Sequence, residues 1–492
     1  MSLVLAIDQS TSATKAVLFD AQGKVLDRAS REHRQIYPQP GWVEHDAEEI
    51  WQNVLTVARD IASRNRDRLA QLIGVSITNQ RETILVFDRA TGRPLHNAIV
   101  WLCRRGEPIC QLLREQGLDE MVRGKTGLKI DTYFSASKIK WLVRENPEIA
   151  AKLKSSQAIV GTIDAWLVHR LTGGKVFATD HTNASRTLLF DINRLRWDER
   201  LCELFDVPLN ALAEVRESAS SFGETDLGGI LPHRVPICGV MGDSQASLFA
   251  QRCFQPGMVK ATFGTGTSVL LNLGDKFRLS ERGAVSALAW VWRGQPTYAF
   301  EGIINFSAAT ISWLKDQLGL IQNSSEAEQL ATAVPDNGGV YLVPAFSGLS
   351  APYWKPEARA AIIGMTAHTR REHIVRAAEE AIAYQIRDVL EMMRADAPIK
   401  LQNLYADGGP TRDQFLMQFT ADLAELELKV SEVPESSAWG AAMSGLLGLE
   451  ICHSLDDLAA LPREIRSYRP RMDPAQAKRL YEGWLAAVKR TL

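Results

Sequence analysis

The sequence predicts an α/β protein built from two similar halves. Its 492 residues exceed what one hydrophobic core normally supports, so two or three domains are expected. Short apolar runs that suit strands alternate with segments of helical periodicity. A strand, a turn rich in hydroxyl residues and a second strand occur near residues 3–24 and again near 258–273, which indicates an internal repeat.

Composition excludes several classes of protein. Hydrophobic residues make up 46% of the chain and charged residues 23%, as in ordinary globular proteins. A net charge of -2 without basic runs predicts neither nucleic-acid nor membrane binding. No apolar run reaches the ~20 residues of a spanning helix, and no signal peptide is evident. The six cysteines are scattered and the nine histidines lack metal-ligand spacing. We therefore expect a cytoplasmic protein without disulfides or a transition-metal site.

The N-terminal hairpin carries a polar turn. Leu3–Ile7 and Ala16–Phe19 are predicted strands that flank the eight residues 8–15, Asp-Gln-Ser-Thr-Ser-Ala-Thr-Lys. Amides and hydroxyls crowded into one turn hold phosphate oxygens, and Lys15 would neutralise them. Taken alone, such a turn is more often an ordinary polar loop.

A second hairpin of the same kind favours phosphate binding over an ordinary polar loop. Residues 258–262 lead into Phe263-Gly264-Thr265-Gly266-Thr267-Ser268 and then into the apolar run 269–273. Two such hairpins facing each other would hold a polyphosphate between them. The pattern GxxxxGK[ST] is absent, as are GxSxG and the protein-kinase signatures, so P-loop enzymes, serine hydrolases and protein kinases are excluded.

Asp243 lies between the two hairpins. It follows the predicted strand 235–242 and begins a predicted helix. Aspartate is a good helix N-cap, and this feature alone favours a cap over a catalytic role. The predicted phosphate-binding hairpins on either side favour a catalytic role for Asp243 instead.

The remaining elements of the first half alternate between strands and helices. Asp46 is predicted to cap a helix to about Arg64, with Glu49 completing a capping box. The predicted strand 72–77 ends at Arg81 and Glu82, a fork donor beside an acceptor, which suits recognition of vicinal hydroxyls. An ordinary exposed ion pair is the alternative. Further strands are predicted at 98–101 and 159–163, and helices from about residue 137 and after 164.

The second half contains the clearest helix, from about Arg371 to Met393. Its apolar residues recur every fourth position, which predicts one face packed on a sheet; they are Ile374, Ala378, Ile382, Ile386 and Leu390. Strands are predicted at 340–345 and 404–406, the latter followed by Asp407-Gly408-Gly409, where a ligand can approach the backbone closely. A helix is expected after residue 412, and a linker at 462–474 leads to a terminal helix.

Several motifs in order carry a family resemblance. They are residues 8–15, 37–46 (Tyr-Pro-Gln-Pro-Gly-Trp-Val-Glu-His-Asp), 77–83 (Ile-Thr-Asn-Gln-Arg-Glu-Thr), 98–101, 182–187, 242–243, 264–266, 348–354 and 407–409. Together they make the chain resemble the FGGY carbohydrate kinases over nearly its whole length, and most of all their glycerol kinase branch.

The resemblance implies a fold and a reaction. The fold is that of actin-like ATPases, with two ribonuclease H-like α/β domains flanking a central cleft. Residues 1–251 would hold the substrate pocket, the first phosphate hairpin and the catalytic base, and residues 252–492 the second hairpin and the nucleotide. The reaction would be ATP- and Mg²⁺-dependent phosphorylation of a terminal hydroxyl of a small polyol, glycerol giving glycerol 3-phosphate.

Position by position, the resemblance implies these roles. Asp243 would be the general base and Asp8 would help to hold Mg²⁺. The polyol pocket would be lined by Arg81, Glu82, Trp101, Tyr133, Asp243, Ser244 and Ser268. The nucleotide would be bound by Thr11, Ser12, Ala13, Lys15, Thr265, Ala308, Ser312, Gly409 and Asp413.

The chain departs from the glycerol kinase pattern at several of these positions. Ser244 stands where glutamine is usual and Ser268 where an aromatic residue is usual, so a larger polyol or sugar (erythritol, threitol, xylulose or ribulose) is the alternative substrate. Lys15 replaces arginine, while Ala308, Ser312 and Asp413 replace glycine, glutamine and asparagine. The feedback loop of some bacterial members is not matched around 227–235.

Two readings from other classes stay open at this point. The chain could be an actin-like ATPase that regulates a partner, although such proteins share the hairpins without the polyol-pocket residues. A sugar-binding regulator without turnover is disfavoured, because the base, the phosphate turns and the metal aspartate are all present. A homodimer and a homotetramer are both compatible with the sequence.

Overall fold

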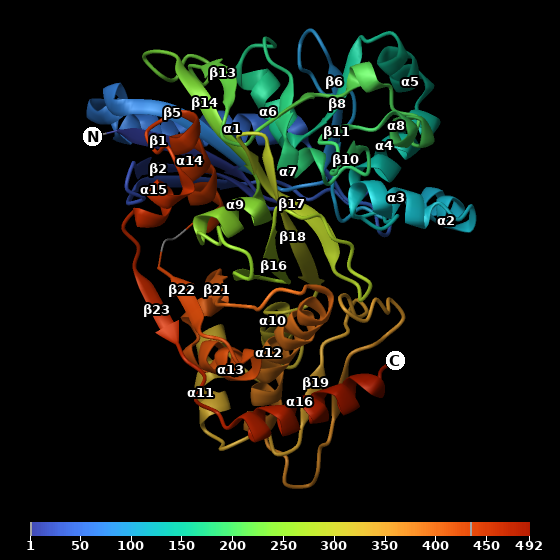
Figure 1. Ribbon diagram of the computed structural model, residues 1–492, viewed down its shortest axis with the longest axis vertical. Coiled ribbons are helices and arrows are strands. Elements are labelled where there is room, and N and C mark those ends of the chain that lie inside the picture. Colours follow the sequence, from blue (N-terminus) through green and yellow to red (C-terminus); the bar gives the residue numbers. More distant parts are fainter. Residues whose placement is uncertain (1, 433–434) are drawn as a thin grey trace.

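The computed structural model describes residues 2–432 and 435–492, and two large sheets dominate it (Figure 1). The first is six-stranded, in the order β13 (Ser221–Thr225), β14 (Val235–Gly242), β5 (Leu72–Asn79), β1 (Leu3–Gln9), β2 (Ala13–Asp20) and β3 (Val25–Glu32). The second is seven-stranded, in the order β17 (Val285–Trp292), β18 (Gln295–Ile304), β16 (Thr267–Gly274), β15 (Val259–Phe263), β21 (Leu404–Asp407), β22 (Leu428–Ser431) and β23 (Ile465–Tyr468).

The two sheets repeat one topology, which confirms the predicted internal repeat. In the first, β1 pairs antiparallel with β2 and parallel with β5, which pairs parallel with β14. In the second, β15 pairs antiparallel with β16 and parallel with β21, which pairs parallel with β22. The two predicted phosphate turns are therefore equivalent connections, β1–β2 and β15–β16.

Four smaller sheets accompany the two large ones. A four-stranded sheet runs β4 (Glu44–His45), β7 (Ala98–Ile99), β6 (Ile84–Asp88) and β8 (Ala158–Thr162). Three two-stranded sheets pair β10 (Phe190–Asp191) with β11 (Arg196–Trp197), β12 (Glu214–Arg216) with β9 (Ala178–Asp180), and β19 (Tyr341–Val343) with β20 (Ala361–Ile363).

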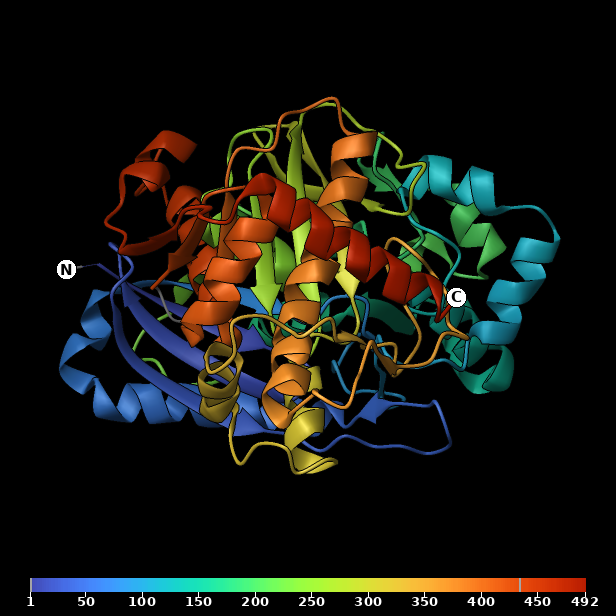
Figure 2. The same cartoon turned by 90° about the horizontal axis from the view of Figure 1, so that it is seen from below.

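Helices cover both large sheets. Those of the first half are α1 (Ala47–Arg64), α2 (Glu107–Glu115), α3 (Asp119–Thr126), α4 (Ser135–Glu145), α5 (Pro147–Lys154), α6 (Ile163–Leu171), α7 (His181–Ala184), α8 (Glu199–Leu204) and α9 (Asp243–Ala250). Those of the second are α10 (Ala309–Asp316), α11 (Ser324–Thr332), α12 (Arg371–Asp396), α13 (Gln414–Ala424), α14 (Ser436–Gly448), α15 (Leu455–Ala460) and α16 (Pro474–Lys489), which crosses over α13 and β19 (Figure 2). Short 3₁₀ turns lie at Arg66–Gln71, Leu209–Ala211 and Gly409–Arg412.

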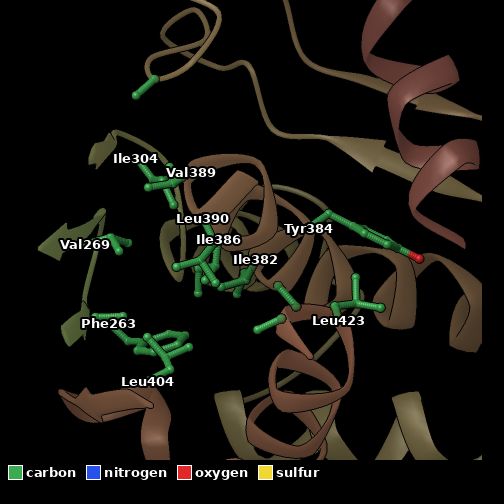
Figure 3. Packing of buried hydrophobic residues seen from close by; sticks show 14 of the residues in the cluster. Phe263, Val269, Ile304, Ile382, Tyr384, Ile386, Val389, Leu390, Leu404 and Leu423 are labelled. Carbon is green, nitrogen blue, oxygen red and sulfur yellow. The ribbon is translucent and has the colours of Figure 1, made fainter. Parts of the chain in front are cut away.

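The core of the second half is centred on α12. Ile382, Ile386 and Leu390 pack towards the strand residues Val269 and Leu404 (Figure 3). The prediction of a single buried face was wrong, because α12 also packs against α10, α11 and α13 and is buried around most of its circumference. Alanines between the larger residues allow these neighbouring helices to approach closely.

The helix α14 ties the two halves together. It follows the second half in sequence but packs on β1, β5 and β14 of the first sheet and against α9. A Cβ at Gly440 would lie 1.8 Å from the carbonyl oxygen of Ala246, so this crossing requires glycine. As a result, α9 is held between the two sheets (Figure 1).

Three local predictions need correction. Asp46 does cap α1, but Glu49 accepts from the Arg34 amide instead of closing a capping box. The N-cap of α9 is Gly242, and Asp243 is its first helical residue. The segment 462–474 is not all linker, because its residues 465–468 form β23 at the sheet edge.

Two global expectations are also addressed by the structure. The six cysteines are buried free thiols. In the described part of the chain, none of the helices is both long and apolar enough to span a membrane.

Candidate active site

Four buried charged side chains form a closed ring beside α9. Arg81, in the turn after β5, pairs with Glu301 of β18 at 2.8 Å, and Glu301 pairs with Arg186 at 2.7 Å. Arg186 pairs with Glu82 at 2.6 Å, and Glu82 lies 4.0 Å from Arg81. The two positive and two negative charges alternate around the ring. The alternative of an ordinary exposed ion pair at Arg81 and Glu82 is wrong, because all four side chains are buried.

The ring holds its two carboxylates differently. Burial alone would raise the pKa of Glu301, but Arg186 and Arg81 outweigh burial and hold this pKa at about 2. For Glu82, burial outweighs the attraction of the two arginines and raises the pKa. The backbone of Glu82 has φ 62°, and its carbonyl accepts a hydrogen bond from Ser135 Oγ at 3.0 Å. Such a conformation in a non-glycine residue is typical of functional sites.

Asp243 lies at the edge of the ring, next to Arg81, and its carboxylate is partly exposed to solvent. Its Oδ1 is 3.1 Å from Arg81 Nε, although this N–H is not aligned for a hydrogen bond with it. The same oxygen accepts a hydrogen bond from the Ser244 amide at 2.6 Å. The side chain of Asp243 is 38% exposed, whereas that of Arg81 is 4% exposed. The carboxylate is thus oriented by the protein and still open to a ligand.

Aromatic side chains line the other side of this region. The rings of Trp101 and Tyr133 lie 5.1 Å apart, and Trp101 Nε1 donates to Thr11 Oγ1 at 2.9 Å. The loop that carries Tyr133 is fixed by the buried Lys138, whose Nζ donates to three successive carbonyls of that loop. Burial lowers the pKa of Lys138 to about 8 and raises that of the Tyr133 phenol. Through its hydrogen bond with Trp101, Thr11 of the first hairpin contacts the predicted wall of the substrate pocket.

The first hairpin also holds a carboxylate suited to a metal ion. Asp8 is 6% exposed, and burial raises its pKa to about 7. A divalent cation would favour the ionised form, and hard carboxylate oxygens are the ligands that Mg²⁺ prefers. The described residues contain no cluster of three or more metal-ligating side chains. The single buried carboxylate of Asp8 fits Mg²⁺, which takes one or two carboxylates and completes its shell with water and phosphate oxygens.

Lys15 is paired within the protein. Its Nζ lies 2.6 Å from Glu435, which precedes α14. Burial would lower the pKa of Lys15, but the nearby Asp8 and Glu435 raise it. The ion pair connects the first hairpin to the second half of the chain. The neighbouring Ser12 is exposed and Ala13 is buried at the start of β2.

The second hairpin is joined to the start of α10. The carbonyl of Thr265 accepts from the amides of Ser307 and Ala309, and that of Gly264 accepts from Ala308. Thr265 itself is exposed. A Cβ at Gly408 would lie 1.9 Å from the Phe263 carbonyl, so the 407–409 turn abuts this hairpin closely. Thr265, Ala308 and Gly409 are thus brought to one place.

Two further predicted nucleotide residues lie on neighbouring helices. Ser312 is exposed one turn along α10, and Asp413 caps α13 by accepting from the Leu416 amide at 2.7 Å. Glu328 of α11 accepts from the amide of Gln414, next to Asp413. Burial, together with Glu328, raises the pKa of Asp413 to about 6.

Sequence reasoning missed Arg186, Glu301 and Gln245. Arg186 falls in the 182–187 motif but was assigned no role, although a buried arginine needs an anionic partner. Glu301 interrupts the apolar strand β18, and an isolated charge in a buried strand is the signal that could have found it. Gln245, on α9, accepts from Arg81 Nη1 at 3.2 Å.

Family models match both halves of the chain. The N-terminal domain of the FGGY family of carbohydrate kinases matches residues 3–250, and its C-terminal domain matches residues 259–449. Glycerol kinase 2 of Thermotoga maritima is 45% identical over 494 aligned positions, covering 100% of this chain and 99% of the relative. A glycerol kinase of Carboxydothermus hydrogenoformans is 46% identical, covering 99% and 97%.

Solved structures agree in fold. The crystal structure of Plasmodium falciparum glycerol kinase with ADP superposes with a TM-score of 0.94 at 38% identity, covering 100% of this chain and 98% of that one. A ligand-bound xylulose kinase from Lactobacillus acidophilus has a TM-score of 0.89 at 19% identity, covering 99% and 97%, which shows the shared fold. With both family models matched and full-length relatives above 40% identity, this chain belongs to the FGGY family of carbohydrate kinases.

Proposed function

We propose that this carbohydrate kinase transfers the γ-phosphoryl group of ATP to a terminal hydroxyl of glycerol, giving glycerol 3-phosphate and ADP. Full-length similarity to proteins named glycerol kinases supports glycerol as the substrate. The observation that carries the proposal is Asp243, an accessible carboxylate oriented by a buried ring of charges. This arrangement offers a base at the point where a small polyhydroxy compound would meet fixed donors and acceptors.

Asp243 would act as the general base. A glycerol hydroxyl within hydrogen-bond reach of Oδ would lose its proton to Asp243 as its oxygen attacks the γ-phosphorus. Arg81 orients this carboxylate from 3.1 Å without a hydrogen bond that the reaction would have to break. Arg81 and Glu82 would bind the other hydroxyls, with Trp101 and Tyr133 against the carbon atoms. Ser244 and Ser268 would complete the pocket.

The two hairpins would hold the phosphates from opposite sides. Thr11, Ser12, Ala13 and Lys15 would contribute from the first and Thr265 from the second, while Asp8 would hold Mg²⁺. When bound, Mg²⁺ neutralises phosphate charge and orients the transferred group. Lys15 would exchange Glu435 for a phosphate oxygen, since both are anionic partners at the same hairpin. Ala308, Ser312, Gly409 and Asp413 would contact the rest of ATP.

The boundary between the two proposed domains lies between residues 251 and 252, directly after α9. Movement of the two parts towards each other would exclude water and direct the phosphoryl group to glycerol. Buried free cysteines are compatible with the cytoplasm, where we propose that the enzyme works as a homodimer or homotetramer.

A larger polyol is the second candidate substrate. Ser268 Oγ donates to Glu301 Oε1 at 3.3 Å, so a short hydroxyl side chain, itself half-buried, contacts the ring where a larger residue would fill space. A four- or five-carbon substrate would occupy that space.

An ADP-release assay over glycerol, erythritol, threitol, xylulose and ribulose tests the proposal. We expect the highest kcat/KM with glycerol and no release with ATP alone. A preference for a larger compound would establish the second candidate instead. ADP release that ignores every polyol would favour a regulatory ATPase and contradict both.

A further inference from the structure

A pocket of about 540 Å³ lies at the end of α9 opposite Asp243. Its walls come from the segment after α9, from β21 and from the chain between α15 and β23, on the left of Figure 1. The residues that matter to the argument are Arg252, Phe254, Met258, Tyr405, Leu455 and Arg463. None of the residues assigned above to the substrate, the metal or the nucleotide lines this pocket.

Two arginines of this pocket have no acidic partner. Within the described residues, neither Arg252 nor Arg463 lies within ion-pair distance of a carboxylate. The acidic residue in the pocket lining, Asp456, is exposed. Burial and the charge of Arg463 together lower the pKa of Arg252 to about 10. Two cations have therefore been brought together and partly removed from water, which is unfavourable unless an anion joins them.

Backbone carbonyls accept hydrogen bonds from some N–H groups of these two arginines but not from all of them. Arg252 donates through both Nη atoms to the carbonyls of Ala459, Leu461 and Pro462, and Arg463 Nη1 donates to the Gln251 carbonyl at 2.7 Å. Arg463 Nε and Nη2, and Arg252 Nε, are buried and have no aligned acceptor in the described structure. Carbonyl oxygens satisfy donors but do not neutralise the two positive charges.

The unused edge of Arg463 has the geometry that oxyanions bind. Nε and Nη2 are the two parallel donors of one side of a guanidinium, the fork that pairs bidentately with phosphate or carboxylate. The guanidinium of Arg463 lies 4.7 Å from the centroid of the Tyr405 ring, which fixes its plane. Burial lowers the pKa of Arg463, and the nearby Tyr405 and Cys253 offset this effect only in part.

One wall of the pocket is apolar, although polar side chains also line it. Phe254, Met258 and Leu455 are half-buried hydrophobic side chains, and with Tyr405 they form a wall beside the two arginines. A cavity of this size accommodates a small organic molecule. An anionic head on the arginines with a short apolar body against this wall matches both parts of the lining.

We propose that this pocket is a second ligand site, which binds a small phosphate monoester through the Nε–Nη2 edge of Arg463 and the charge of Arg252. The site is connected to the nucleotide side by two hydrogen-bonded steps. Arg463 donates to the Gln251 carbonyl, and Gln251 Nε2 donates to Asp407 Oδ2 at 3.2 Å, in the turn beside the second hairpin.

Calorimetric titration of the full-length protein tests the proposal, with phenyl phosphate and inorganic phosphate as probes and phenol as the uncharged control. We expect phenyl phosphate to bind more tightly than inorganic phosphate, because its ring contacts the apolar wall, and phenol to show no binding. The variant R463Q should weaken phenyl phosphate binding at least about 10-fold, and R463K about 3-fold or more, since lysine keeps the charge but loses the fork.

The matched control is R479Q, which removes the same charge from an exposed position on α16. It should bind phenyl phosphate as the wild type does. The affinity for phosphate bound elsewhere, including between the hairpins, should not change when Arg463 is substituted. Equal phenyl phosphate affinities in wild type, R463Q and R463K would therefore overturn the proposal, as would equal losses in R463Q and R479Q. Should R463Q fail to fold, R463K against R479Q decides.

Discussion

The proposed substrate side and the proposed nucleotide side of the candidate active site differ in the groups that form them. Around Arg81, four charged side chains from three separate segments are buried and paired with one another. Around Thr265, the site consists of backbone turns, and its side chains are exposed or half-buried. The first arrangement is complete before a ligand arrives, whereas the second gains its partners from the ligand. We infer that selectivity is set on the rigid side and that the nucleotide completes the other.

Removing one charge from the ring should have the largest effect. Glu301→Gln would leave Arg81 and Arg186 buried without their shared carboxylate, and loss of one partner of a buried ion pair costs about 3–5 kcal/mol. We expect a loss of this size in the free energy of unfolding, measured by urea denaturation, together with loss of activity. The control Glu281→Gln changes an exposed residue and should be neutral. Unchanged stability in E301Q would mean that the ring is not the rigid part of the site.

Asp8 should make the metal-free protein sensitive to pH. Its pKa is near 3.8 in the unfolded chain and about 7 when folded, so the folded state binds the extra proton and stability falls as pH rises between these values. Between pH 5 and pH 7, wild type should lose about 2 kcal/mol relative to Asp8→Asn, and Mg²⁺ with nucleotide should restore part of it. Denaturation of both proteins in EDTA at the two pH values measures this.

In that experiment, Asp67→Asn is the matched control, because Asp67 is exposed. A constant difference between wild type and D8N across this pH range would show that Asp8 is not the buried, protonated group inferred here.

The smallest effect is expected in the second hairpin. Thr265→Ala removes an exposed hydroxyl, so the free energy of unfolding should change by less than about 0.5 kcal/mol. The KM for ATP should rise several-fold while the KM for glycerol stays the same. Steady-state kinetics with each substrate varied in turn, with Thr332→Ala as the surface control, would show this. An equal rise in both KM values would contradict the proposed separation of the two sides.

The local hairpins and the non-local ring also differ in how well the sequence predicts them. The hairpins, their repeat and the place of Asp243 could be predicted, because a turn and its two strands are local in sequence. The ring could not, since Glu301 meets Arg81 across 220 positions and only the register of β18 brings them together. The pairing of Lys15 with Glu435 is equally non-local.

The other errors have local causes. Strand β23 was taken for linker because a short edge strand next to prolines and arginines has little apolar pattern. The surroundings of α12 were underestimated because alanines outside the predicted face, such as Ala377, Ala381 and Ala383, were not counted as contact residues. The cap of α1 at Asp46 was correctly predicted, since capping depends on neighbouring residues alone.

Asp243→Asn tests the central claim most directly. The amide keeps the shape of the side chain but cannot take a proton, so kcat for glycerol phosphorylation should fall by about 10²–10⁴-fold. Glycerol binding, measured by calorimetry, and thermal stability should be close to those of wild type, because the side chain is partly exposed and outside the closed ring. A D243N variant that binds glycerol and still releases ADP at a rate near wild type would contradict the role proposed for Asp243.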